Sequence, residues 1–294
     1  MNIGEKIREL RVAKLMTQSE LAGTRITRNM LSCIENGSAQ PSLSTILYIA
    51  GRLNVPVGFL LAEEGDEVVY RKMNSMPNIK RAYTAGDWWG CRSLCLSGCP
   101  VADDEISLLL AKCDAEIAVE EFEQGRLHSS CRFFDEALDY AEKTIYPTNE
   151  IEARALVYFR YMQRLSPTLF SDMLDSDKTL GFLWQSPFAA YVEVLEALDR
   201  GEQGKAIDFL SVTDETLFYA DHIRVRLLMD SMHFYEAKQA LRALLDSENP
   251  LNKVDLYTVL CELEVCCRET DDYRSAYNYA TEKMQLLEQL LKEI

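Results

Sequence analysis

The sequence is poor in glycine, proline and histidine, and it contains no long apolar run. Thirteen glycines and eight prolines in 294 residues leave few positions that would interrupt a helix. No apolar stretch approaches the ~20 residues that cross a bilayer, so we expect no membrane partner. The C-terminal two thirds is also rich in Ala, Leu, Glu and Arg. Together these features predict an all-α protein.

Sequence signatures of catalysis and of cofactor binding are also missing. The three histidines, His128, His222 and His233, are isolated and form no HExxH pair. The segment 201–205, GEQGK, is too short for a phosphate loop and lacks its Ser or Thr. We therefore expect no catalytic residue, no cofactor and no enzymatic activity.

The nine cysteines leave one chemical alternative open. Cys91, Cys95 and Cys99 are spaced four residues apart, so they could share a helix face and form the thiolate metal centre of an enzyme. Because no fourth ligand is indicated and Cys91 and Cys95 fall at core positions, we expect buried thiols and no metal site. The first residues are charged and form no apolar signal core, so we expect reduced thiols in a cytoplasmic protein.

The formal net charge of −16 is unevenly distributed. Residues 1–62 carry seven basic and four acidic side chains, whereas the remainder is strongly acidic. A basic segment can approach the phosphates of DNA, and an acidic body repels them and limits indiscriminate coating. For the body alone, an acidic surface that serves only solubility is an equally good interpretation.

Residues 1–62 show the spacing of five short helices. Apolar residues at helical intervals predict a helix over 3–14. Thr17 and Glu20 form a capping-box pattern for a helix over 18–23, and Thr27 can cap a helix over 28–35 that ends before Gly37. A fourth helix opened by Pro41-Ser42 runs to Leu53, and a last turn covers 57–61. We expect the core to contain Leu21, Ala22, Ile26, Leu31, Ile34, Leu43, Leu47, Ala50, Leu53, Val55 and Leu60.

The helix over 28–35 has an apolar face, Leu31 and Ile34, and a polar face that begins with Arg28 and Asn29. Arg can donate two hydrogen bonds to guanine, and Asn can pair in the same way with adenine. Polar groups near the helix ends suit phosphates. The full set of expected DNA-binding residues is Gln18, Thr27, Arg28, Asn29, Ser32, Cys33 and Asn36.

The segment 17–61, TQSELAGTRITRNMLSCIENGSAQPSLSTILYIAGRLNVPVGFLL, resembles the helix-turn-helix domain of the lambda-repressor-like, or xenobiotic-response-element (XRE), regulators. The resemblance implies a five-helix bundle over 1–64, a recognition helix at 28–35, and a homodimer on a two-fold, double-stranded DNA operator. Arg25 stands where members commonly carry Gly, and Gly23 lies earlier. We therefore expect a tighter turn before the recognition helix.

Residues 65–294 contain a recurring turn that is followed, five residues on, by a small residue in a new helix. The turns lie at Gly86, Gly125, Gly201, Met232 and Asp271, and the small residues are Cys91, Ser130, Ala206, Ala237 and Ala276. The long gap between the second and third copies predicts a degenerate repeat near Ser166-Pro167-Thr168. Stacked helix pairs of this kind bury a continuous core that no single pair could bury.

The pattern resembles the tetratricopeptide repeat (TPR), best in the segment 122–143, FEQGRLHSSCRFFDEALDYAEK. The resemblance implies a TPR-like α-solenoid of about six helix pairs over 65–294, whose last helix caps the array or serves in dimerisation. The first helix of each pair would line a concave wall. Aromatic side chains there suit an extended peptide, with arginines available for a carboxylate. The expected peptide-binding residues are Phe122, Arg160, Tyr161, Phe188, Tyr191, Tyr219, His222, Arg226 and Arg268.

An XRE-type head on a TPR-like body is similar to the RRNPP group of peptide-sensing regulators. The resemblance implies a transcription regulator whose body dimerises and binds a short peptide or protein effector. The alternative is a protein-interaction scaffold in which the head serves pairing and not DNA binding. The sequence does not indicate the operator or the sign of regulation.

Overall fold

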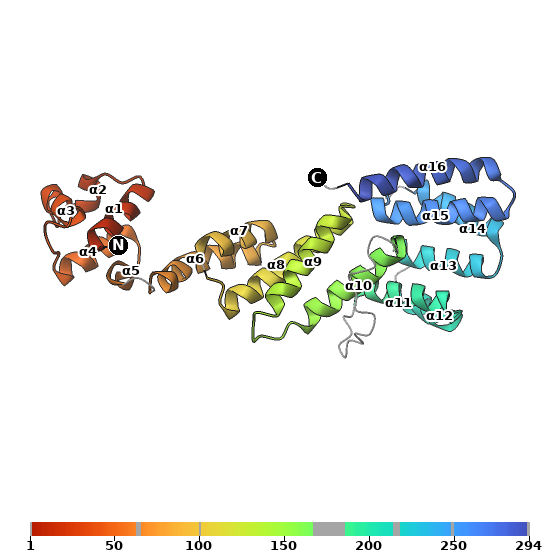
Figure 1. Ribbon diagram of the computed structural model, residues 1–294, viewed down its shortest axis with the longest axis horizontal. Helices are drawn as coiled ribbons and strands as arrows, with labels where there is room; N and C mark the ends of the chain where they lie inside the picture. The colour runs from red at the N-terminus through yellow and green to blue at the C-terminus, as the bar shows by residue number, and fades with distance from the viewer. Residues whose placement is uncertain are drawn as a thin grey trace. The chain divides into compact units, whose positions relative to one another are not determined.

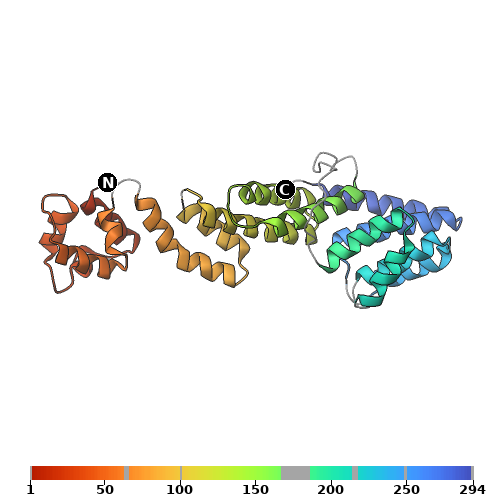
Figure 2. The ribbon, with the colours of Figure 1, turned by 90° about the horizontal axis from the view of Figure 1, so that it is seen from below.

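The structure is a computed structural model that describes residues 2–62, 66–99, 101–166, 186–213, 218–247 and 250–292 (Figures 1 and 2). All regular secondary structure in these ranges is helical, which confirms the all-α prediction. The chain divides into two compact units, residues 1–106 and 107–294. The division predicted at residues 64 and 65 rests on sequence resemblance and stays a prediction.

The first unit begins with five short helices: α1 (Ile3–Ala13), α2 (Gln18–Ala22), α3 (Arg28–Glu35), α4 (Leu43–Leu53) and α5 (Val57–Leu61). Their ends follow from local caps. Thr17 Oγ1 accepts a hydrogen bond from the Glu20 amide at 3.1 Å, and Glu20 Oε2 accepts one from the Thr17 amide at 2.6 Å. Thr27 Oγ1 caps α3 by accepting from the Met30 amide at 3.1 Å. The capping pattern in the sequence therefore places these helices correctly.

The five helices enclose one apolar core, and one part of its predicted membership was wrong. Leu21, Leu31, Ile34, Leu53 and Leu60 are buried as expected, and Ile26 and Val55 pack partly buried against them. In α4, however, Leu43 and Leu47 are 63% and 52% exposed, while Ile46 and Ile49 are buried. Both faces of α4 carry aliphatic residues, so periodicity along the helix does not decide which face points inward. Packing against the other helices makes that choice.

The remaining helices continue the chain in the following order: α6 (Asp66–Thr84), α7 (Trp88–Gly98), α8 (Asp104–Glu123), α9 (Leu127–Ala141), α10 (Asn149–Leu165), α11 (Pro187–Asp199), α12 (Gln203–Val212), α13 (Phe218–Asp230), α14 (Phe234–Leu245), α15 (Lys253–Glu269) and α16 (Tyr273–Leu290). Neighbours in sequence pack as pairs, as α15 and α16 show in Figure 1. The pairs are α6–α7, α8–α9, α11–α12, α13–α14 and α15–α16. Of the degenerate repeat expected at 166–168, Pro167 and Thr168 lie outside the described residues.

Each of the five predicted turns contains a residue with a left-handed backbone. The φ angles are +71° at Gly86, +75° at Gly125, +79° at Gly201, +62° at Met232 and +56° at Asp271. In every case the second helix of the pair begins two residues later. The left-handed residue reverses the chain tightly and lets the second helix run back along the first. Glycine adopts this conformation without the steric cost that Met232 and Asp271 incur.

The small residue five positions after each turn is buried in all five pairs. Cys91, Ser130, Ala206 and Ala237 are completely buried, and Ala276 is 8% exposed. A small side chain at this point allows the second helix to approach the first closely. The left-handed turn and the buried small residue therefore act together, and both are needed for the two helices of a pair to pack closely.

The turn at Met232 supplies a stability prediction. Its side chain is 72% exposed, so replacing it loses little buried area, whereas glycine would relieve the left-handed strain. We expect Met232→Gly to raise the free energy of unfolding of the full chain by about 0.5–1 kcal/mol, measured by urea denaturation. Met284→Gly, at a position 62% exposed inside α16, is the matched control and should lower it by about 1 kcal/mol. A loss of stability in both variants would contradict the assignment of strain to the turn.

Candidate functional site

A buried carboxylate holds the first three helices together. Glu35, at the end of α3, is 4% exposed. Its two oxygens accept hydrogen bonds from Arg11 Nε at 2.7 Å and Arg11 Nη2 at 3.0 Å, and Gln18 Nε2 donates to Oε2 at 2.9 Å. Burial acts to raise the pKa of Glu35, but the hydrogen bonds from Arg11 and Gln18 outweigh it, and the net pKa is lowered. α1 and the start of α2 are thus tied to α3.

The outer face of α3 is open to solvent. Arg28, Asn29, Cys33 and Asn36 are exposed, and Ser32 is half-buried. Within the described part of the chain, neither the Arg28 nor the Asn29 side chain has a hydrogen-bond or ion-pair partner. This surface, called here the α3 face, therefore carries donors and acceptors that the bundle itself does not use.

Two further residues of the predicted DNA-binding set make contacts inside the bundle. The Thr27 hydroxyl is exposed but accepts the capping hydrogen bond of α3. Gln18 is half-buried, and one N–H of its side-chain amide donates to Glu35, which helps to hold α3. The amide nitrogen carries a second N–H, which is the kind of donor that a phosphate accepts from. A phosphate contact by Gln18 therefore stays a prediction.

The turn between α2 and α3 is fixed from α4. Gly23 ends α2 with φ +55°, and a side chain there would collide with the hydroxyl of Tyr48. Tyr48 donates a hydrogen bond from that hydroxyl to the carbonyl of Ala22 at 3.0 Å. The guanidinium of Arg25 lies 5.6 Å from the centre of the same ring. Tyr48 thus braces the turn in which Arg25 takes the place of the usual glycine.

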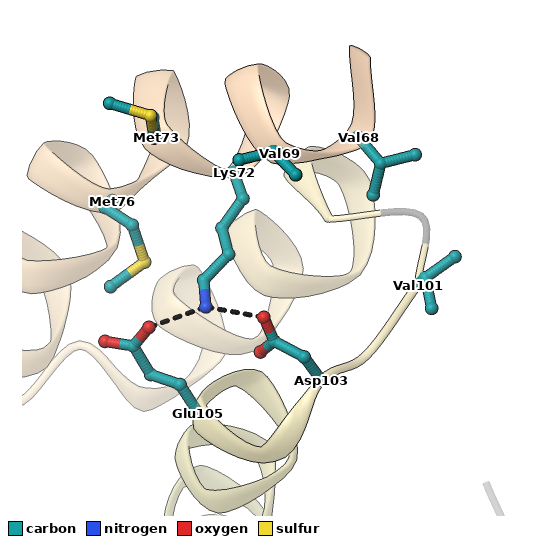
Figure 3. Close-up of a pocket in the computed structure, with 8 residues that line it drawn as sticks. All are labelled: Val68, Val69, Lys72, Met73, Met76, Val101, Asp103 and Glu105. Carbon is teal, nitrogen blue, oxygen red and sulfur yellow. Dashed lines mark hydrogen bonds and ion pairs between the residues drawn. The ribbon is translucent and has the colours of Figure 1, made fainter. Parts of the chain in front are cut away.

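A second feature of the first unit is a pocket of about 390 Å³ beside α6 (Figure 3). It is lined by Val68, Val69, Lys72, Met73, Met76, Val101, Asp103 and Glu105. Lys72 crosses it and pairs with Asp103 at 2.7 Å and with Glu105 at 2.6 Å. Burial acts to lower the pKa of Lys72, yet these two carboxylates raise it overall. The cation is therefore already neutralised, and the rest of the lining is apolar.

The second unit contains a cluster of aromatic side chains that come from four different helices. The inner cluster, as we call it, consists of Phe122 of α8, Tyr158 and Tyr161 of α10, Phe188 and Tyr191 of α11, and Tyr219 of α13. Tyr191 and Tyr219 stack with ring centres 4.6 Å apart, and Phe188 lies 5.3 Å from Tyr161. The structure thus brings together five residues of the predicted peptide-binding set.

Polar groups of α13 and α15 adjoin the inner cluster. His222 Nδ1 lies 2.8 Å from the Tyr191 hydroxyl, and its Nε2 lies 2.9 Å from Glu262 Oε2. Tyr161 and Thr258 share a hydrogen bond of 3.2 Å between their hydroxyls. These contacts place the buried end of the cluster against one face of α15.

Asp255 lies on that same face of α15, half-buried. Asn252 Nδ2 donates to its Oδ2 at 2.7 Å, and no described cation pairs with it. Burial raises the pKa of Asp255 to about 6. His222 and the hydrogen bond from Asn252 act to lower this pKa, and the nearby charge of Glu123 acts to raise it. A carboxylate is therefore held in an environment that disfavours its charge.

The three arginines of the predicted peptide-binding set differ in their surroundings. Arg226 pairs with Asp199 at 3.2 Å and with Glu262 at 3.5 Å. Arg268 is 54% exposed and lies near Glu264 and Glu269 of its own helix. Arg160 is half-buried. Arg226 is therefore already paired, and the binding of a peptide carboxylate by these arginines stays a prediction.

The cysteines form no disulfide, and eight of the nine are buried or half-buried, Cys33 being the exposed one. Cys91, Cys95 and Cys99 are buried. Across the described ranges, no three His, Cys, Asp or Glu side chains gather as a metal site would require. Burial raises the pKa of Cys131 to about 12, which makes its thiolate unavailable at neutral pH.

The first unit thus contains a bundle in which a short helix, preceded by a tight turn, shows its polar face to solvent. Residues 7–60 match the family described as Helix-turn-helix, and this bundle is a helix-turn-helix domain. A stretch of 65 residues is 35% identical to the immunity repressor protein of Bacillus phage phi105. The match covers 22% of this chain and spans 45% of the repressor's length.

Whole-chain comparisons give low structural overlap. The chain is similar to Bacillus thuringiensis PlcR in complex with the peptide PapR7 and DNA, at 13% identity over 99% of both chains with a TM-score of 0.22. It is similar to S. thermophilus ComR in complex with DNA and its signalling peptide ComS, at 14% identity over 97% of this chain and 99% of ComR, again with a TM-score of 0.22. Streptococcus dysgalactiae Rgg2, an SHP pheromone receptor, gives 14% identity and a TM-score of 0.20 over 97% and 99% of the two chains. TM-scores this low do not establish a shared arrangement of the whole chain.

Within the described helices, none is long and apolar enough to cross a membrane.

Sequence reasoning missed the carboxylates on which both sites depend. Glu35 was recognised only as part of a motif, and its partner Arg11 lies 24 residues away. Asp255 and Glu262, with Thr258 between them, follow helical spacing on α15, which is the one signal that could have pointed to a polar face. Tyr158, on the same helix as Tyr161, was also missed. Nothing along the chain indicates that these groups meet, because they come from separate helix pairs.

The Glu35 interactions predict a pH-dependent loss of stability. Glu35→Gln should lower the free energy of opening of the helix-turn-helix domain by about 2–3 kcal/mol at pH 7, because Arg11 keeps its buried charge without a partner. The lowered pKa means that the stabilisation is present above pH ~4.5 and disappears as the carboxyl is protonated, so the gap between the proteins should close as the pH falls below ~4. Hydrogen exchange of the α3 backbone amides, followed in the full-length wild type and in Glu35→Gln, measures this difference in the free energy of opening.

Glu9→Gln, at an exposed position of α1, is the charge-matched control and should leave α3 exchange unchanged. Equal protection in wild type and Glu35→Gln at pH 7 would contradict the structural role of the carboxylate.

Asp255 predicts the opposite pH behaviour. Because its pKa is about 6 when folded and near 4 when unfolded, the folded protein holds the extra proton, and stability falls as the pH rises through that window. Asp255→Asn should therefore raise the free energy of unfolding by about 1–2 kcal/mol at pH 8, after allowance for partial exposure, and by much less at pH 5. Urea denaturation of the full chain at both pH values measures this, with the exposed Asp208→Asn as control. A destabilised Asp255→Asn at pH 8 would show that the carboxylate is needed in its charged form.

Proposed function

We propose that the protein is a sequence-specific, double-stranded-DNA-binding transcription regulator that reads base edges with the α3 face. The observation that carries the proposal is the exposure of Arg28 and Asn29 at the start of a helix whose opposite side is locked into the bundle core. The 35% identity to a phage immunity repressor over a stretch of 65 residues supports it.

The chemistry of the α3 face fits a major groove. Arg28 can donate two hydrogen bonds to the O6 and N7 of guanine, and Asn29 can pair with the N6 and N7 of adenine. Asn36 and Ser32 extend the polar strip along the helix, and Cys33 offers a small apolar contact. Glu35, Arg11 and Gln18 hold the helix so that these side chains keep a fixed register on the bases.

In this proposal, residues 65–294 form a TPR-like array that serves as the sensory and dimerising part. The inner cluster gathers aromatic side chains from successive helices, five of them buried and Tyr219 half-buried, next to polar groups of α13 and α15. We infer that this region of the array takes an extended peptide or a segment of a protein effector. We further infer a homodimer that places two α3 faces on a two-fold operator. The role is regulatory and not enzymatic, and it is exercised in the cytoplasm, where reduced thiols such as these persist.

The proposal is tested by the base preference of Arg28→Ala. Sites are first selected from random double-stranded DNA with the wild-type chain, and the affinity of both proteins is then measured by fluorescence anisotropy. We expect a loss of about 1–3 kcal/mol, roughly 5- to 150-fold, confined to sites with the cognate base at one position. Binding should also weaken steeply with salt.

Lys14→Ala, an exposed position outside α3, removes the same charge and serves as the control. It should weaken all sites equally, if at all, and leave the base preference intact. If the wild-type chain enriches no sequence, or Arg28→Ala and Lys14→Ala behave alike, the α3 face does not read DNA and the scaffold alternative takes its place.

A further inference from the structure

The pocket beside α6 has apolar walls that are open to solvent (Figure 3). Val69 and Met73 of α6 are 58% and 54% exposed, and Val101, in the segment before α8, is 64% exposed. Single exposed aliphatic residues are ordinary, whereas several around one cavity mark a site for an apolar ligand or partner. The volume of about 390 Å³ lies within the range of pockets that bind small organic molecules.

Two contacts outside the pocket hold α6, which forms most of its wall. Tyr70 packs edge-on against Phe59 of α5, with ring centres 6.3 Å apart. On the side of α7, Gly98 lies so close to α6 that a Cβ atom there would collide with the Ser75 side chain. The wall is therefore formed before a ligand arrives, and binding loses little free energy to ordering of the protein.

The polar part of the lining carries one more negative charge than positive charge. Lys72 Nζ pairs with Asp103 at 2.7 Å and with Glu105 at 2.6 Å. Asp103 uses both oxygens, because its Oδ1 also accepts a hydrogen bond from the Ile106 amide at 3.1 Å. The Oε1 atom of Glu105 has no partner among the described residues, and this side chain is 50% exposed. One carboxylate oxygen at the pocket is thus left to accept from a ligand.

We propose that this pocket binds a small organic cation, with an apolar body that lies against Val69, Met73 and Val101 and an ammonium group that donates to Glu105. The excess negative charge of the lining attracts a cation and disfavours an anion, while the ion pairs of Lys72 stay intact. The site shares no residue with the inner cluster or the α3 face. The inference therefore depends neither on peptide sensing nor on DNA binding.

The test uses methionine-methyl NMR of the full chain, labelled with carbon-13 at these methyl groups. Met73 and Met76 line the pocket, whereas Met284 lies on α16 and serves as the internal reference. Their signals are assigned with single Met→Leu variants. The probes are phenylbutylamine, phenylbutanol and phenylbutyrate, which share one apolar body, and hexylamine, hexanol and hexanoate, which share a second.

We expect the amine probes to shift the Met73 and Met76 signals in a saturable titration and to leave the Met284 signal in place. Each amine should bind roughly threefold or more tightly than the alcohol with the same body, because an exposed ion pair adds a modest amount to affinity. The carboxylate probes should bind more weakly than the alcohols.

Variants at exposed positions separate the charge from the apolar wall. Glu105→Gln should reduce the preference for amine over alcohol to less than about twofold, and Asp208→Asn, an exposed acid on α12, should keep it. Val69→Ser should weaken every probe by roughly three- to tenfold, because it removes part of the apolar wall. Val212→Ser, at a position that is 84% exposed on α12, should weaken none. Circular dichroism verifies that all four variants are folded.

Three results would overturn the proposal. The first is that no probe shifts the Met73 or Met76 signal, and the second is that Met284 responds to the same degree, which indicates unspecific adsorption. The third is that alcohols or carboxylates bind as tightly as amines, or that the preference for amines survives in Glu105→Gln. None of these results bears on base reading by the α3 face, which the DNA titrations measure separately.

Discussion

The helix-turn-helix domain depends on the buried carboxylate of Glu35, whose charge needs hydrogen-bond donors from neighbouring helices. Glu35 sits where α3 meets the core, and a charge there is tolerable only because Arg11 approaches it with two nitrogens and Gln18 adds a third donor. Since these partners come from α1 and the start of α2, satisfying one side chain fixes three helices. The polar face of α3 then points outward by necessity, because Leu31 and Ile34 occupy the core side.

In the second unit the governing constraint is close packing of repeated helix pairs. A left-handed residue reverses the chain, and a small residue lets the returning helix approach. Repetition of this unit brings the first helices of successive pairs side by side. Aromatic residues from α8, α10, α11 and α13 therefore meet in one cluster, and the acidic face of α15 lies against it. The electrostatic character of that cluster is a property of the stack and of no single repeat.

The two sites differ in how their polar groups are used. In the bundle, the buried carboxylate of Glu35 has hydrogen-bond donors on both of its oxygens. The polar side chains without a described partner, Arg28 and Asn29, lie on the exposed α3 face. At the inner cluster, the unmatched group Asp255 is half-buried, and its surroundings act against its charge. Groups retained in such a position make the protein less stable than it could be, which is typical of binding sites.

The sequence by itself determined the helices, their caps and the repeated turns, because those features depend on hydrogen bonds and backbone sterics within a few residues. Thr17 with Glu20, Thr27, and the five turn residues from Gly86 to Asp271 all act as their local patterns indicate. Tertiary structure alone decided that α4 buries Ile46 and Ile49 instead of Leu43 and Leu47. It also brought Arg11 to Glu35, and Asp255 and Glu262 to the tyrosines of other helices. Burial and charge pairing are set by neighbours that lie far apart along the chain, and no local pattern records which neighbours those are.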